Sequence, residues 1–327
     1  MKYSNRKNLL VFGLFFICIF MFSACSTTDK TNEGDSTSSS DSAIKSKEQA
    51  IMLAEQEVKS NNLDQAIFYY IQALEFDNED VDILYTIGDM QNTLDSPELA
   101  ARAFKHVLTI KPNHIAALAQ MGIYHLEHKN MDKAKKTLER TVKLDQLRLD
   151  KNASIKHFIT LDNQSPILAY NALAVLSDLD SRHDYARKIF NLLIPISDDL
   201  SLIYTNIGFS YYLSHHYILA ESYYKKALDI NSDYERAKLN LGLIYVRTGQ
   251  YSKSIQLFKQ VMTTAEAYND IGYFLLLDGR YQEAEYFLQN AIDLSPTYFE
   301  KGHINLENVK IYLRESEVSA DASTSLN

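Results

Sequence analysis

SLIYTNIGFSYYLSHHYILAESYYKKALDINSDY, residues 201–234, is the stretch of sequence that decides the fold. Apolar residues recur in it at the spacing of two amphipathic helices joined by a short turn. Small residues lie twelve and then seven positions apart, where two closely crossing helices leave little room for side chains. The residues that carry the pattern are Tyr204, Ile207, Gly208, Tyr211, Ala220, Tyr224 and Ala227. The stretch therefore predicts one helix-turn-helix unit.

The same register recurs along most of the chain. Units begin at Lys47, Val81, Ile115, Ile167, Ser201, Glu235 and Ala265, and a last helix opens at Phe299. Starts within each of the runs 47–115 and 167–235 are 34 residues apart. This period resembles the tetratricopeptide repeat, a helix-turn-helix unit that stacks into a superhelix. We expect an all-α tetratricopeptide repeat superhelix of about seven repeats with a C-terminal capping helix.

Two departures from the period organise the repeats. Eighteen extra residues between Leu149 and Pro166 predict a loop. This insertion or linker, residues 149–166, separates three N-terminal repeats (47–148) from four C-terminal repeats with the cap (167–315). The interval from Glu235 to Ala265 is only thirty residues, which predicts a turn shortened by four residues. Ordinary variation in loop length is the alternative explanation of both departures. Residues 316–327 are expected to form a flexible tail.

The N-terminus carries a second signal. Three basic residues precede an apolar run, Leu9–Phe22, that is too short for a comfortable membrane span. This is the pattern of a secretory signal peptide, which we place at residues 1–24. Residues 25–46 are rich in Ser, Thr and Asp and have almost no apolar residues, so they predict a disordered tether.

The end of this signal resembles a bacterial lipobox. Phe22-Ser23-Ala24-Cys25 has small residues before the cysteine, although phenylalanine stands where leucine is usual. We therefore expect Cys25 to become the first mature residue and to carry a covalent lipid that anchors the protein to a membrane. A plain signal peptide with an incidental cysteine is the alternative. The residue after Cys25 is Ser26. An aspartate at that position would favour retention in the inner membrane, so its absence favours the outer membrane.

Composition argues against several function classes. The net charge is −9, and removal of Lys2, Arg6 and Lys7 with the signal peptide makes it −12, so nucleic acid is not expected as a partner. No phosphate-binding loop, nucleophile elbow or metalloprotease motif occurs. His125 and His128 lie one helical turn apart, but their neighbours are typical of an exposed face and predict no metal site. We expect no enzyme activity, no cofactor other than the lipid, and no small-molecule substrate.

The predicted concave wall of the C-terminal repeats offers a candidate binding site. In this repeat type the groove is lined by positions two, five, nine, twelve and thirteen of each first helix. Here those positions are largely apolar, whereas the second repeat places Asp82 and Asp89 there. The predicted groove residues are Leu202, Phe209, Tyr212, Leu213, Leu239, Leu243, Val246, Tyr273, Leu276 and Leu277. Either a partner segment or the chain's own last helix, Phe299–Leu313, should cover this wall.

Residues 203–213, 237–243 and 267–273, together with the lipobox and tether, resemble the TadD-like lipoproteins of the tight-adherence (Tad/Flp) pilus. The resemblance implies a pilotin-like role on the periplasmic face of the outer membrane. Such a protein assists the assembly of the secretin through which the pilus passes. A general envelope adaptor that recruits peptidoglycan enzymes or outer-membrane assembly factors is the alternative function.

Overall fold

The computed structural model describes residues 44–152 and 158–324. The predicted signal peptide, Cys25 and the tether up to residue 43 lie outside these described residues. The chain divides into two units, residues 1–44 and 45–327, and every described helix belongs to the second. The described residues form helices and turns and contain no strand.

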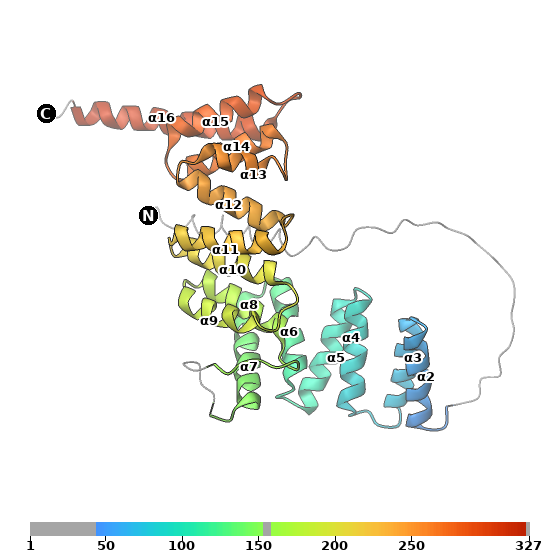
Figure 1. The fold of residues 1–327 in the computed structure, drawn as a ribbon. Helices are drawn as coiled ribbons and strands as arrows, with labels where there is room; N and C mark the ends of the chain where they lie inside the picture. Colours follow the sequence, from blue (N-terminus) through green and yellow to red (C-terminus); the bar gives the residue numbers. More distant parts are fainter. Residues whose placement is uncertain (1–43, 153–157, 325–327) are drawn as a thin grey trace, which may run out of the picture. The chain divides into compact units, whose positions relative to one another are not determined.

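The helices follow one another in chain order with short connections. They are α2 (Lys47–Lys59), α3 (Leu63–Leu74), α4 (Val81–Thr93), α5 (Pro97–Ile110), α6 (Ile115–Glu127), α7 (Met131–Leu149), α8 (Ile167–Leu179), α9 (His183–Leu193), α10 (Leu200–Leu213), α11 (Tyr217–Ile230), α12 (Glu235–Arg247), α13 (Tyr251–Phe258), α14 (Thr264–Leu277), α15 (Tyr281–Asp293) and α16 (Glu300–Thr324). Seven helix pairs and a final single helix result (Figure 1).

The helix starts follow the period of the sequence. Five first helices begin at the predicted residue, whereas α10, α14 and α16 begin one residue away from it. Capping explains the difference at α10 and α14: Asp199 accepts a hydrogen bond from the backbone of Leu202, and Thr263 forms a capping box with Glu266. The predicted fold class, an all-α tetratricopeptide repeat superhelix, is confirmed.

Glycines lie at the predicted helix crossings. A Cβ atom built on Gly208 would lie 2.7 Å from the Tyr224 ring, and one on Gly242 would lie 2.2 Å from the Phe258 ring. Gly88, Gly122 and Gly272 face Phe104, Leu138 and Leu288 in the same way, always sixteen residues later. The large side chain of each second helix therefore occupies the space that the glycine of the first helix leaves empty.

The short interval between the sixth and seventh repeats arises differently from the prediction. The turn is retained, because residues 259–263 separate α13 from α14 much as residues 231–234 separate α11 from α12. The missing length lies in the second helix itself, since α13 has 8 residues and α11 has 14. Thr263 has an extended backbone and caps α14, so the chain has to leave the helical conformation of α13 before this residue.

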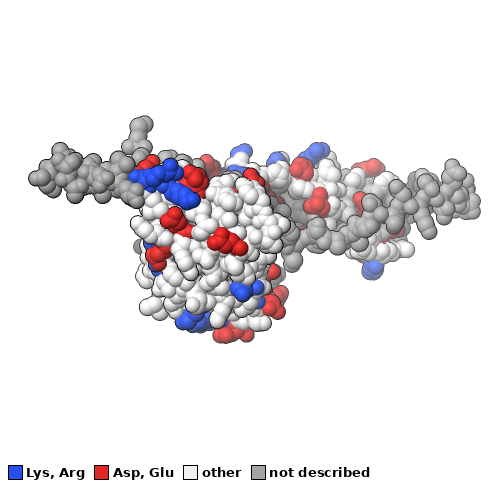
Figure 2. Space-filling view, turned by 90° about the horizontal axis from the view of Figure 1, so that it is seen from above, with Lys and Arg blue, Asp and Glu red and all other residues white. Residues whose placement is uncertain are grey.

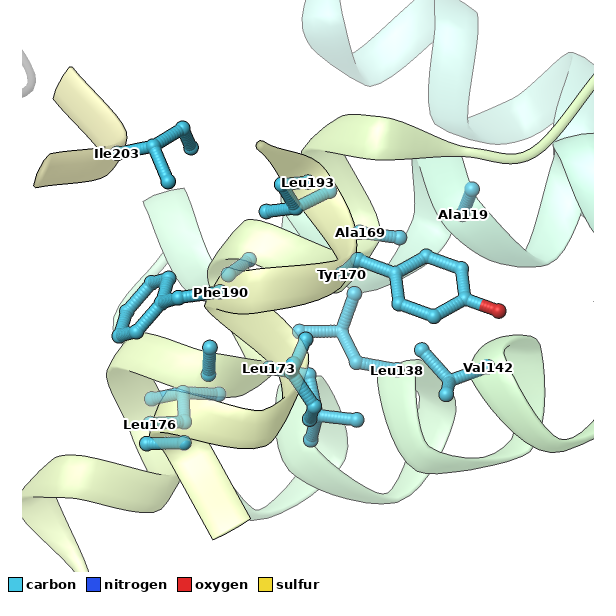
Figure 3. Packing of buried hydrophobic residues seen from close by; sticks show 14 of the residues in the cluster. Ala119, Leu138, Val142, Ala169, Tyr170, Leu173, Leu176, Phe190, Leu193 and Ile203 are labelled. Carbon is cyan, nitrogen blue, oxygen red and sulfur yellow. The ribbon is translucent and has the colours of Figure 1, made fainter. Parts of the chain in front are cut away.

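The insertion does not divide the repeats into separate bodies. α8 packs on both α6 and α7, as the first helix of a next repeat should. One hydrophobic cluster joins Leu138 and Val142 of α7 to Leu173 of α8, Phe190 of α9 and Ile203 of α10 (Figure 3). The three repeats before the insertion and the four after it therefore pack in one continuous stack. The insertion connects two helices, α7 and α8, that pack directly against each other.

Hydrogen bonds attach the end of the insertion to α7. The Gln146 side chain donates to the carbonyl of Ile159 at 3.1 Å and accepts from its amide at 2.7 Å. Arg148 donates to Asp162 from two nitrogens, at 2.8 and 2.7 Å. This guanidinium holds the pKa of the Asp162 carboxyl well below its usual range. Residues 158–165 thus form an ordered segment rather than a free linker.

The last helix is longer than predicted and extends the stack. α16 continues to Thr324, through most of the expected flexible tail, because residues 316–324 include no glycine or proline that would end it. It packs on α14 and α15, with Leu306 and Val309 buried against them. α16 therefore takes the place of an eighth first helix. No described helix is long and apolar enough to cross a membrane.

Candidate partner-binding groove

The first helices of the C-terminal repeats form the inner layer. Successive first helices contact one another from α6 through α8, α10, α12 and α14 to α16. No comparable contact joins α9 to α11, α11 to α13 or α13 to α15. A stack that is closer on one side than on the other curves toward the closer side, so the first helices line its concave wall. This is the wall that the sequence predicted to bind a partner.

The structure sorts the ten predicted groove residues into two packed clusters and two outlying leucines. Phe209, Tyr212, Leu213 and Leu243 belong to a cluster between α10 and α12. Leu239, Val246, Tyr273 and Leu276 belong to one between α12 and α14. Leu202 and Leu277 lie in neither of these clusters.

Burial removes three predicted residues from the binding surface. Val246 is fully buried, and Tyr212 and Leu276 are each 8% exposed. Position twelve of the repeat thus packs between neighbouring first helices instead of facing a partner. The prediction that these three side chains line an open groove is wrong. The other seven are half-buried or exposed, and Leu277 is 44% exposed.

Tyr212 instead begins a polar chain across three first helices. Its hydroxyl accepts a hydrogen bond from Arg247, and Arg247 forms an ion pair with Asp278 at 2.7 Å. Burial raises the pKa of the Tyr212 hydroxyl. The chain ties the ends of α10, α12 and α14 together, and it provides a polar margin to the apolar wall.

Two polar atoms of α10 have no hydrogen-bond partner among the described residues. Asn206 is 3% exposed and donates to Asn171 of α8 at 2.9 Å, but its side-chain oxygen has no partner. The Thr205 hydroxyl is also buried and without a partner. A buried polar group without a partner costs free energy, so these atoms are candidates to bind a ligand or water.

Two exposed leucines extend the wall and were missed from the sequence. Leu168 and Leu179 of α8 are 69% and 39% exposed. They occupy positions two and thirteen of the fourth repeat, the same positions as Leu202 and Leu213 in the fifth. The register that found the other residues would have found these two. A row of leucines therefore continues along the wall from α8.

Charge is distributed without a dominant sign on the face seen from above Figure 1. Figure 2 shows acidic and basic side chains scattered over a surface that is mostly uncharged. His125 and His128, the pair considered for a metal, both lie against the Tyr124 ring, with centroids 5.8 and 4.0 Å from its centroid. Among the described residues no group of three His, Cys, Asp or Glu side chains could hold a metal ion.

Comparison with known proteins supports the repeat assignment. Three tetratricopeptide repeat family models match residues 202–234, 239–272 and 264–304. The chain contains tetratricopeptide repeats. These repeats are protein–protein interaction modules, so the chain carries an interaction scaffold. No curated protein matches the sequence.

Solved structures with this fold come from several bacteria. A tetratricopeptide repeat protein from Parabacteroides merdae is 13% identical, with a TM-score of 0.52 over 81% of this chain and 98% of that chain. The C-terminal part of a repeat protein from Cytophaga hutchinsonii is 15% identical, with a TM-score of 0.50 over 78% and 99%. PilF of Pseudomonas aeruginosa is 16% identical, with a TM-score of 0.48 over 75% and 97%. The likeness to the first two of these structures shows the fold alone.

Proposed function

We propose that the protein is a lipid-anchored scaffold that binds a segment of a protein partner on the leucine-rich wall of α8, α10, α12 and α14. The observation that carries the proposal is the exposure of this wall. Leu168, Leu179 and Leu277 are each more than one-third exposed on the concave side. α16 packs on α14 and α15 and does not cover α8 or α10. Exposed apolar surface in a concave site favours a binding partner.

The partner we propose is the secretin of a Tad/Flp pilus, and the role is that of a pilotin-like assembly factor at the periplasmic face of the outer membrane. The resemblance of the repeats and lipobox to TadD-like lipoproteins supports this choice. The protein acts by placing its partner, without catalysis and without a cofactor other than its lipid. The second candidate is an envelope adaptor for peptidoglycan enzymes or outer-membrane assembly factors, which the same wall would serve.

The wall is tested by adding charge to it. Leu202→Asp combined with Leu277→Asp should abolish secretin binding, because carboxylates would have to lose their water at an apolar interface. The fold should survive, since neither leucine belongs to the core clusters of α10, α12 and α14. The measurement is the amount of secretin multimers and surface pili in a strain that carries the double variant.

Ile218→Asp with Leu219→Asp is the matched control, because it adds the same charge to exposed apolar residues of the outer helix α11. This control should leave multimers and pili unchanged. Normal multimers in the groove variant would refute the proposed wall. Normal multimers and pili in a strain that lacks the protein would refute the pilotin role and favour the adaptor.

The lipid anchor is tested separately. Cys25→Ser should abolish incorporation of labelled palmitate, because the thiol that accepts the lipid is absent. Cys18→Ser is the matched control, since Cys18 is the only other cysteine and lies within the predicted signal peptide. Labelling should persist in Cys18→Ser. Palmitate on the Cys25→Ser protein would contradict the lipoprotein assignment.

A further inference from the structure

A second concave site lies outside the groove, between α7, α9 and the turn from α10 to α11. It is a pocket of about 880 Å³, within the range of small-molecule sites. Its lining includes Arg140 and Lys143 of α7, Arg182 and Arg187 beside and within α9, and the imidazoles of His183 and His216. The pocket is therefore formed where the third, fourth and fifth repeats meet.

The residues beneath this pocket break the pattern of the repeat. Asp178 occupies position twelve of its repeat, where the next three repeats have Tyr212, Val246 and Leu276. Asp178 is 5% exposed, and burial raises the pKa of its carboxyl. A buried carboxyl at a position that usually packs apolar side chains costs stability. Departures of this kind from a local rule are expected at functional sites.

Asp178 and its neighbours hold the His183 and Arg187 side chains of the pocket in place. The Asp178 carboxylate lies 2.8 Å from His183 Nδ1 and accepts from the Ser210 hydroxyl at 2.8 Å. Arg187 donates to the Ser210 and Ser214 hydroxyls at 3.1 and 3.2 Å, and its guanidinium lies over the Tyr211 ring. These bonds fix the His183 and Arg187 side chains before any ligand arrives.

Donors remain available at the same place. Arg182 uses one terminal nitrogen, Nη2, for Glu139 at 3.2 Å and for the Ser177 hydroxyl at 3.3 Å, whereas its Nη1 donates to none of the described residues. His183 contacts Asp178 through Nδ1, so the other ring nitrogen of His183, Nε2, takes no part in that contact. A guanidinium whose terminal nitrogen faces no protein acceptor can donate to an oxyanion.

The charge of the lining selects an anion. Four cationic side chains and two carboxylates, Glu139 and Asp184, line the pocket, so the lining itself carries a net charge of +2. Arg187 pairs with Asp184 at 2.5 Å and Arg182 with Glu139 at 3.2 Å, so the excess charge lies on Arg140 and Lys143. The whole chain has a net charge of −9. A positive pocket in an acidic protein is a local feature that composition does not explain. A charge of +2 matches a phosphomonoester, which carries close to two negative charges at neutral pH.

We propose that this pocket is an anion site that binds a phosphomonoester group through Arg140, Lys143, Arg182 and Arg187. The group could belong to a free phosphate or to a lipid headgroup, which share this chemistry. The site is independent of the groove, because it lies on the side of the second helices.

The test is a titration of the ¹⁵N-labelled full chain with inorganic phosphate, monitored by NMR. Saturable shifts are expected for backbone amides of residues 181–187 and 214–216, at phosphate concentrations where sodium chloride of equal ionic strength has no effect. Arg140→Gln with Lys143→Gln should weaken binding about tenfold or more, since two cations of the lining are lost. Lys133→Gln with Lys136→Gln, which removes two cations of α7 outside the pocket, should bind like the unmodified protein.

Further arms identify the source of the group. Preferential binding to phosphatidylcholine vesicles that contain phosphatidic acid, lost in the Arg140 and Lys143 variant, would assign the site to a lipid headgroup. Binding of free phosphate alone would assign it to a soluble ligand. The absence of saturable binding in both arms would overturn the proposal. Displacement of phosphate by hexaglutamate at lower concentration would also overturn it and would indicate an acidic peptide instead.

Discussion

Gly242→Leu is expected to destabilise the C-terminal repeats by about 3 kcal/mol. Any Cβ at this position would lie 2.2 Å from the Phe258 ring, and that ring is 1% exposed. Phe258 cannot move outward easily, because it is packed in the cluster that also contains Val246 and Ile271. Leucine adds three more carbons to the same space. The helices α12 and α13 must therefore separate or the ring must leave its site.

The measurement is chemical unfolding followed by circular dichroism. Gln256→Leu is the control, because it introduces the same side chain at an exposed position of α13. It should change the free energy of unfolding by less than about 0.5 kcal/mol. The double variant Gly242→Leu with Phe258→Ala should lose less stability than the sum of the two single changes, because the smaller residue makes room for the larger. Additive losses would contradict the proposed contact.

The fold could be predicted from the sequence because its determinants are short-range and periodic. A glycine or alanine at a fixed position marks each helix crossing, and the large residue that fills the crossing lies sixteen positions later, as Gly208 and Tyr224 do. The ends of the first helices gave a weaker signal. Five residues that end them have positive φ although they are not glycine, namely Asn61, Asp95, Lys129, Ser181 and His215. Only at Gly249 and Gly279 does the residue type itself indicate a positive φ, because glycine adopts this conformation readily.

The candidate sites could be predicted only in part, because burial depends on the neighbouring repeat. Position twelve was assigned to the groove, yet Val246 packs fully against α14. The anion pocket joins residues of three repeats, and the sequence contains no motif that places Arg140 near Arg187. What the sequence did contain was the departure at Asp178, where a carboxyl replaces the apolar residue of the later repeats. Such departures are the most useful signal in a periodic chain.

Asp145→Ala is expected to cost about 3 kcal/mol and to release the insertion from α7. Asp145 is fully buried; it accepts from the Tyr170 hydroxyl at 2.9 Å and from Arg148 at 2.9 and 2.7 Å. Burial raises the pKa of the Tyr170 hydroxyl, so this group stays protonated and needs an acceptor. Alanine leaves that hydroxyl without its acceptor and removes one of the two carboxylates of Arg148.

The remaining carboxylate, Asp162, belongs to the insertion and is more exposed, which is why it cannot replace Asp145. The unfolding free energy of Asp145→Ala measures the loss, and Asp229→Ala, at an exposed position of α11, should leave it unchanged. Hydrogen exchange at the Ile159 amide reports the insertion itself, because this amide donates to the Gln146 side chain beside Asp145. Exchange at Ile159 should accelerate more than exchange within α10. If Ile159 stays as protected as before while global stability falls, the network supports only the repeat core, and the insertion is held by its apolar contacts through Phe158 and Leu161.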